Sequence, residues 1–131
     1  MTWEIRADRP VYLQLVEQLE RAIVTGEYPP GSRVPPVREL AAEAGVNPNT
    51  MQRALQALEQ KGLMAVHRTA GRTVAGDGDM LRRLRAEMAL AQAQTFCRDM
   101  ARLGQTAEDA VSLVRQCEEE GYFDGTDPAM Q

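Results

Sequence analysis

Residues 45–63 constrain this chain more than any other stretch, because they encode a tight turn and then a helix with a polar leading end. Asn47 can cap this helix, since its side-chain oxygen can accept a backbone N–H two or three residues later. Pro48 then falls at the first helical position, where its missing N–H costs nothing. Apolar residues at helical spacing predict one buried face, made of Met51, Ala54, Leu55 and Leu58.

The other side of this predicted helix carries polar residues at its leading end, namely Asn49, Thr50, Gln52 and Arg53. Amide and guanidinium side chains can form paired hydrogen bonds with the edges of adenine and guanine. A helix that is buried on one face and presents such groups at its start has the chemistry needed to read the major groove of DNA. The segment therefore predicts a recognition helix.

The flanking segments predict a winged helix-turn-helix, a mainly α fold with a small β wing. Gly45 separates the recognition helix from a short preceding helix, which gives the helix-turn-helix pattern. A turn at 69–71 separates two short strands that would form the wing. The predicted elements are a helix at 10–25, a very short strand at 33–34, a helix at 37–44, the recognition helix, and strands at 63–68 and 72–74.

Residues 10–74 also carry several short motifs in a fixed order. They are Pro10-Val11-Tyr12-Leu13-Gln14-Leu15, Gly26-Glu27-Tyr28-Pro29-Pro30-Gly31-Ser32-Arg33-Val34-Pro35, Arg38-Glu39-Leu40-Ala41, the recognition segment, and Glu59-Gln60-Lys61-Gly62-Leu63. Through these motifs the stretch resembles the DNA-binding domain of the GntR family of bacterial transcription regulators. The segment from Asn47 to Ala54 and the short tail resemble the YtrA subfamily in particular.

This resemblance implies which residues contact DNA. The family's Arg-x-Leu-Ala motif places a DNA-contacting arginine at Arg38. Arg68 and Gly71 match the basic residue and the turn glycine of the wing, and Arg72 is expected to add a phosphate contact. The polar start of the recognition helix falls on Asn47, Asn49, Thr50, Gln52 and Arg53. Relatives often have Arg where this chain has Pro48 and Gln52, so their base contacts cannot be copied.

The charge distribution is compatible with DNA binding although the net charge is −4. Residues 1–76 hold nine basic and eight acidic residues, whereas residues 77–131 hold six and eleven, so the excess acid lies in the tail. The basic residues between the turn and the wing are Arg33, Arg38, Arg53, Lys61, Arg68 and Arg72. They predict a basic face on a nearly neutral domain.

The tail predicts a dimer. Residues 79–103 read as one long helix with two apolar stripes, and Thr106 caps a second helix with an apolar face. Such exposed apolar surface favours pairing with a second copy. We therefore expect residues 1–76 to bind DNA and residues 77–131 to form a homodimer. The candidate interface residues are Leu81, Leu84, Met88, Phe96, Met100, Leu103, Val111 and Val114.

Two recognition helices related by a two-fold axis would read an inverted repeat, which predicts a repressor that covers a promoter. The alternative is a winged-helix protein-interaction module that binds no DNA. A small-molecule effector at the dimer interface, among Met88, Phe96 and Met100, is also left open. The sequence has no phosphate loop, paired histidines or nucleophile elbow, so we expect no enzymatic activity, no cofactor and no metal site.

Three smaller expectations concern the remainder of the chain. Trp3 and Ile5 are expected to be packing residues, and a strand or an arm that lies on the tail is left open for this segment. Cys97 and Cys117 lie in helical patterns without a CxxC motif, which predicts buried, reduced thiols, with a disulfide as the alternative. The sequence lacks a signal-peptide pattern and an apolar run of the roughly 20 residues that cross a bilayer, so a cytoplasmic protein is expected.

Overall fold

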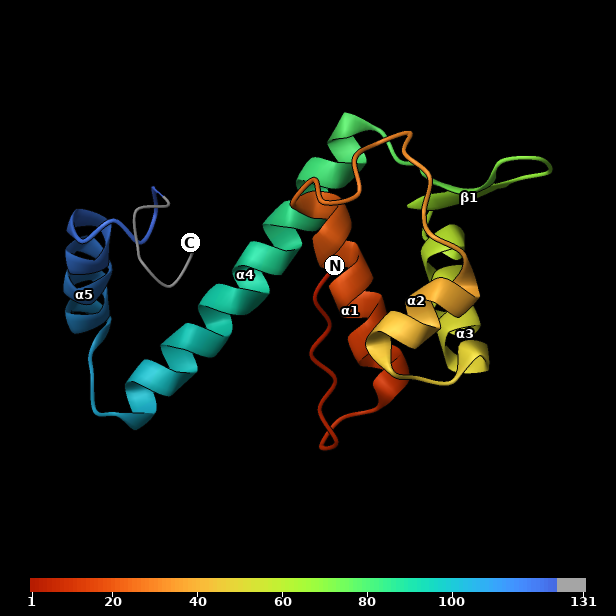
Figure 1. Ribbon diagram of the computed structural model, residues 1–131. Helices are drawn as coiled ribbons and strands as arrows, with labels where there is room; N and C mark the ends of the chain where they lie inside the picture. The colour runs from red at the N-terminus through yellow and green to blue at the C-terminus, as the bar shows by residue number, and fades with distance from the viewer. Residues whose placement is uncertain (125–131) are drawn as a thin grey trace. The chain divides into compact units, whose positions relative to one another are not determined.

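The computed structural model of the chain describes residues 1–124 and divides into two compact units, Met1–Arg85 and Ala86–Gln131. Its elements along the chain are α1 (Val11–Val24), α2 (Val37–Ala44), α3 (Pro48–Gln60), β1 (Met64–His67), β2 (Gly71–Val74), α4 (Gly78–Arg102) and α5 (Ala107–Glu119) (Figure 1). This order, with helices predominating and one antiparallel pair of strands, confirms the predicted winged helix-turn-helix fold.

The core of the N-terminal unit lies where α1 and α2 both pack on α3. The apolar faces expected from the helical periodicity meet there, and burial of each large aliphatic side chain stabilises the fold by about 1.5–3 kcal/mol. Helix α2 ends at Gly45, which adopts a left-handed conformation with φ of 69° and so allows the sharp turn into α3. The largest side chains with almost no exposed surface are Leu15, Leu19, Leu40, Met51, Leu55 and Leu58.

The wing is held to the body by a third short stretch of extended chain. β1 and β2 pair antiparallel, with Met64 opposite Val74 and His67 opposite Gly71. Beside β2, Arg33 forms an isolated bridge with Thr73, and the Val34 N–H donates to the Arg72 carbonyl at 2.9 Å. The predicted strand at 33–34 is therefore present as a single bridge. Because Val34 and Val74 are buried, the base of the wing belongs to the core.

An N-terminal arm lies along α1 and is held there by side-chain amides of that helix. Gln14 is almost fully buried, and its side-chain amide donates to the Arg6 carbonyl at 2.8 Å and accepts from the Arg6 N–H at 2.7 Å. Gln18 makes the same pair of bonds with Glu4. One turn apart on α1, the two amides therefore hold the extended arm as a neighbouring strand would. Trp3 and Ile5 pack against the core of the N-terminal unit, so their predicted packing role is confirmed.

The C-terminal unit contains α4 from Ala86 onward and all of α5. Thr106 and Asp109 form the capping box that begins α5: the Asp109 N–H donates to the Thr106 hydroxyl at 3.1 Å, and the Thr106 N–H donates to the Asp109 carboxylate at 2.9 Å. Hydrogen bonds from Thr106 lower the pKa of Asp109. The predicted cap is confirmed. Leu81 and Leu84, in the part of α4 that belongs to the N-terminal unit, pack against that unit's core.

The cysteines differ from expectation in their exposure. Both are free, but Cys97 is exposed and Cys117 is half-buried, so the prediction of buried thiols is wrong for Cys97. The helical pattern correctly placed Cys97 on α4, but a helix with no buried residue of its own offers no cover for a thiol. Among the described residues, no helix is long and apolar enough to span a membrane.

Candidate nucleic-acid interface

The leading end of α3 has the geometry expected of a recognition helix. Asn47 is the N-cap, with extended backbone angles of −64° and 132°, and its side chain accepts a hydrogen bond from the Asn49 N–H at 2.7 Å. Pro48 occupies the first helical position. The cap satisfies a backbone donor that the helix cannot. Because Asn47 and Asn49 remain exposed, both retain side-chain groups that face solvent.

The contribution of Asn47 to stability can be measured separately from any contact with DNA. Asn47→Ala is expected to lower the free energy of unfolding by about 1 kcal/mol, because the Asn49 N–H loses its acceptor. Asn47→Ser should lower the free energy of unfolding by only about 0.3 kcal/mol, since serine is also a good N-cap. Urea unfolding followed by the fluorescence of Trp3, the single tryptophan, measures both changes in the N-terminal unit. Equal stability of the two variants would contradict a capping role.

The opposite face of α3 anchors the helix, and the remaining positions are accessible. Met51, Ala54, Leu55 and Leu58 are buried, as the periodicity predicted. Arg53 is exposed, and Thr50 and Gln52 are half-buried. Rotation of the helix about its axis would therefore expose core side chains. The packing holds the polar positions of α3 in one orientation, as sequence-specific contacts require.

The wing places further residues near a sharp turn. Gly71 begins β2 with φ of 71°, a left-handed conformation that favours glycine. Arg68 and Thr69 are exposed in the turn between the strands. His67 is not free, because its Nε2 lies 2.8 Å from the Thr73 hydroxyl across the hairpin. The wing thus presents Arg68 at its tip, while His67 is tied to the neighbouring strand.

Ion pairing divides the basic residues of the N-terminal unit into two groups. Within the described chain, Arg38 at the start of α2 and Arg68 in the wing make no ion pair, and neither does Arg33. In contrast, Arg72 donates from Nε to the carboxylate of Glu59. Lys61 Nζ lies 2.9 Å from the Glu20 carboxylate. Unpaired, exposed guanidinium groups can neutralise phosphates without first breaking an ion pair.

Sequence reasoning missed a contact that involves the recognition helix. The guanidinium carbon of Arg53 lies over the ring of Tyr12, 4.8 Å from its centroid. Tyr12 belongs to α1, so no local pattern in α3 could have revealed this partner. Arg33 belongs to the predicted basic face but not to the predicted DNA contacts, although it lies beside the base of the wing.

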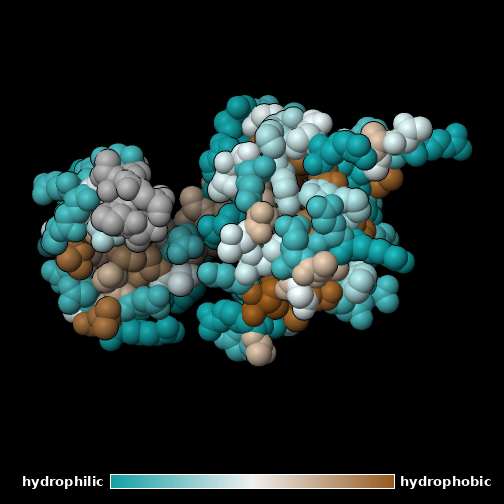
Figure 2. Space-filling model, viewed as in Figure 1, coloured by the Kyte–Doolittle hydropathy of each residue, from teal (hydrophilic) through white to brown (hydrophobic). Residues whose placement is uncertain are grey.

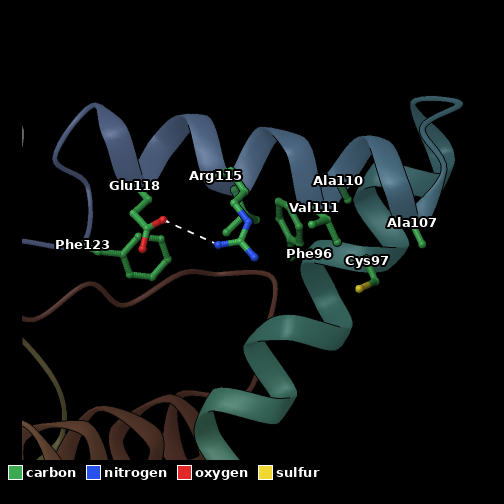
Figure 3. A pocket seen from close by; sticks show the side chains of 9 residues that line it. Phe96, Cys97, Ala107, Ala110, Val111, Arg115, Glu118 and Phe123 are labelled. Carbon is green, nitrogen blue, oxygen red and sulfur yellow. Dashed lines mark ion pairs between the residues drawn. The ribbon is translucent and has the colours of Figure 1, made fainter.

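A separate surface lies in the C-terminal unit. A groove of about 390 Å³ is lined by Phe96 and Cys97 of α4, by one face of α5, and by Phe123 (Figure 3). Arg115 and Glu118 form a 4.0 Å ion pair beside it. Apolar side chains are visible on the surface of this unit, at the left of Figure 2. The large apolar residues of this unit with exposed surface include Leu90, Leu103, Val111, Leu113 and Val114.

Comparison with known proteins explains this arrangement. The family model "Bacterial regulatory proteins, gntR family" matches residues 11–74, from the start of α1 to the end of the wing. An uncharacterized HTH-type transcriptional regulator of Bacillus subtilis, YhcF, is 30% identical over 118 residues, which are 90% of this chain and 98% of that protein. The chain belongs to the GntR family.

Other relatives agree with this membership. The solved structure of a GntR family transcriptional regulator from Listeria monocytogenes superposes with a TM-score of 0.76 and 31% identity, covering 86% of this chain and 98% of that one. The HTH-type transcriptional repressor YtrA of Bacillus subtilis is 36% identical over 66 residues, 50% of this chain and 51% of that protein. This GntR protein is thus a YtrA-like, DNA-binding transcription regulator and not an enzyme, as the sequence predicted.

Proposed function

We propose that this GntR regulator is a homodimeric repressor that binds an inverted-repeat operator. The observation that carries the proposal is the exposed polar end of α3. On the neighbouring elements, the guanidinium groups of Arg38 and Arg68 have no ion-pair partner among residues 1–124. Asn49 and Gln52 would contact adenine edges, and Arg53 a guanine or a phosphate. Arg38 and Arg68 would hold the DNA backbone. Binding to the chromosome implies a cytoplasmic location.

The positions proposed for DNA contact are not equally available. Thr50 and Asn47 lie at the first turn of α3, where the side-chain hydroxyl of Thr50 and the amide group of Asn47 could donate to a phosphate. The backbone N–H groups of this turn already bond to Asn47 and offer no further donor. Gly71 would let the wing backbone approach DNA closely. Arg72 is half-buried in its pair with Glu59, so a phosphate contact there would require that pair to open. We therefore assign Arg72 a smaller share of the binding energy than Arg38 or Arg68.

Self-association is proposed for residues 77–131, and DNA binding for residues 1–76. Support comes from the exposed apolar side chains of the C-terminal unit, which water would otherwise surround. Leu81 and Leu84 already contact the N-terminal core, so they have less apolar surface to offer a second copy. The proposed interface therefore centres on Met88, Phe96, Met100, Leu103, Val111 and Val114.

The proposal also rests on the relatives. YtrA of Bacillus subtilis is described as a repressor, although this chain matches only about half of it. A repressor needs no catalytic group, only occupancy of a promoter. A dimer achieves this occupancy at low concentration because the second half-site binds intramolecularly once the first is bound.

Two substitutions test the proposed contacts on a duplex selected from a random DNA library by the wild-type protein. Arg38→Ala is expected to weaken binding to selected and unrelated duplexes alike and to reduce the salt slope of log K by about one per subunit. Gln52→Ala is expected to reduce the preference for the selected duplex by about tenfold, because it removes a base contact. Fluorescence anisotropy at several salt concentrations measures both effects.

The matched control is Arg82→Ala, which removes the same charge from an arginine paired with Asp79 at the start of α4. It should leave both affinity and base preference unchanged. If neither Arg38→Ala nor Gln52→Ala differs from this control, the assignment of the interface is wrong. If selection enriches no duplex at all, the protein-interaction alternative is favoured over DNA binding.

A further inference from the structure

Arg53, an exposed residue of the recognition helix α3, has its side chain against a residue of another helix, α1. The residue is exposed, and within the described chain it makes no ion pair. Its guanidinium carbon instead lies 4.8 Å from the centroid of the Tyr12 ring. A free arginine side chain samples many rotamers, and DNA binding must select one of them. Fixing one rotamer on binding costs conformational entropy, and an aromatic ring that already holds the guanidinium in the free protein reduces this cost.

Tyr12 is itself fixed in place by the packing of α1 on α3. It is half-buried and packs against the core of the N-terminal unit. A second cross-link joins the same two helices, because Lys61 of the α3 C-terminal end pairs with Glu20 at 2.9 Å. The same sequence separation divides Tyr12 from Glu20 and Arg53 from Lys61. The two helices run in the same direction, as Figure 1 shows, and the two contacts at equal spacing keep Tyr12 beside Arg53.

The chemistry of the contact leaves Arg53 able to bind. A guanidinium group over an aromatic ring is attracted through its face, while its N–H donors point outward in its plane. Those donors match the O6 and N7 atoms of guanine or two oxygens of a phosphate. The Tyr12 ring thus orients the Arg53 guanidinium and leaves its N–H donors available. An acidic partner would instead accept hydrogen bonds from those donors.

We propose that Tyr12 is a positioning residue that sets the direction of the Arg53 guanidinium for DNA binding. The inference rests on the proposed function, since it requires that Arg53 contacts DNA. Tyr12 acts through Arg53, so its contribution should disappear when Arg53 is absent. If Tyr12 only stabilised the core, the effect of its substitution would be the same with and without Arg53.

The experiment is a double-mutant cycle on the selected duplex and on an unrelated duplex. Tyr12→Leu is expected to weaken binding to the selected duplex by between about five- and thirtyfold, because a dimer has two such contacts worth a few-fold each. Tyr12→Phe keeps the ring and should stay within about twofold of the wild type. In an Arg53→Ala background, Tyr12→Leu should have no further effect. A loss of the same size in both backgrounds would overturn the inference.

A second measurement applies even if leucine at position 12 prevents folding. Phenylalanine with increasing numbers of ring fluorines keeps the shape of the ring while it weakens the negative potential of the ring face. Affinity for the selected duplex should fall stepwise with fluorination, and the fall should vanish with Arg53→Ala. Unchanged affinity across the series would overturn the positioning role. Failure to select any duplex would instead overturn the proposed function, and this inference with it.

Discussion

Val114→Glu is expected to dissociate the dimer and to weaken binding to the selected inverted-repeat duplex by about 100-fold or more. Val114 lines the groove of the C-terminal unit, and the residue is 38% exposed in the single chain. In a dimer a carboxylate at this position would lose its hydration without gaining a partner, which is costly. Each monomer would then bind only one half-site. Analytical ultracentrifugation and fluorescence anisotropy measure the two effects.

Ser112→Glu is the control, because it adds the same charge to an exposed position of α5 that does not line the groove. It should leave the sedimentation coefficient and the affinity unchanged. Trp3 fluorescence should show intact N-terminal units in both variants. If Val114→Glu sediments as the wild type does and retains its affinity, the groove is not part of a dimer interface.

Leu55→Ala is expected to lower the free energy of unfolding of the N-terminal unit by about 2–5 kcal/mol. Leu55 lies on α3 with none of its surface exposed, at the point where α1 and α2 meet α3. Removing its branched side chain loses apolar burial and leaves a cavity that the flanking helices fill only in part. A melting temperature lower by roughly 10 °C or more is expected, and DNA binding would be lost with the fold.

The neighbouring residue supplies a control on the same helix. Gln56 is exposed, so Gln56→Ala should change the free energy of unfolding by no more than about 0.5 kcal/mol. Urea unfolding of both variants, followed by Trp3 fluorescence at one protein concentration, gives the comparison. A destabilisation by Leu55→Ala as small as that of Gln56→Ala would mean that the buried face of α3 does not hold the unit together.

Local patterns were enough to predict the helices, the wing and the caps. Helix α2 spans residues 37–44 as predicted, and Asn47, Pro48 and Gly45 have the conformations that their chemistry favours. These features depend on hydrogen bonds and steric limits between residues a few positions apart. The apolar spacing of α3 likewise identified its buried face, since a helix of fixed pitch brings those side chains together.

Contacts between residues distant in sequence could not be predicted in this way. The N-terminal arm pairs with Gln14 and Gln18, because α1 offers two side-chain amides at the spacing of one turn. In the sequence alone, Gln14 and Gln18 cannot be distinguished from ordinary exposed residues of a helix. The position of the arm along α1 therefore could not be predicted, although its packing residues, Trp3 and Ile5, were identified correctly.

The sequence by itself determined the elements, their order and the residue types at the leading end of α3, because each follows from short-range rules. Only the tertiary structure decided which cations remain unpaired. Arg72 and Lys61 pair with Glu59 and Glu20 once α3, the wing and α1 come together. Arg38, in contrast, has no carboxylate partner in the described part of the chain. The physical reason is range: an ion pair or a cation–ring contact depends on distance in space, and only packing brings Tyr12 to Arg53.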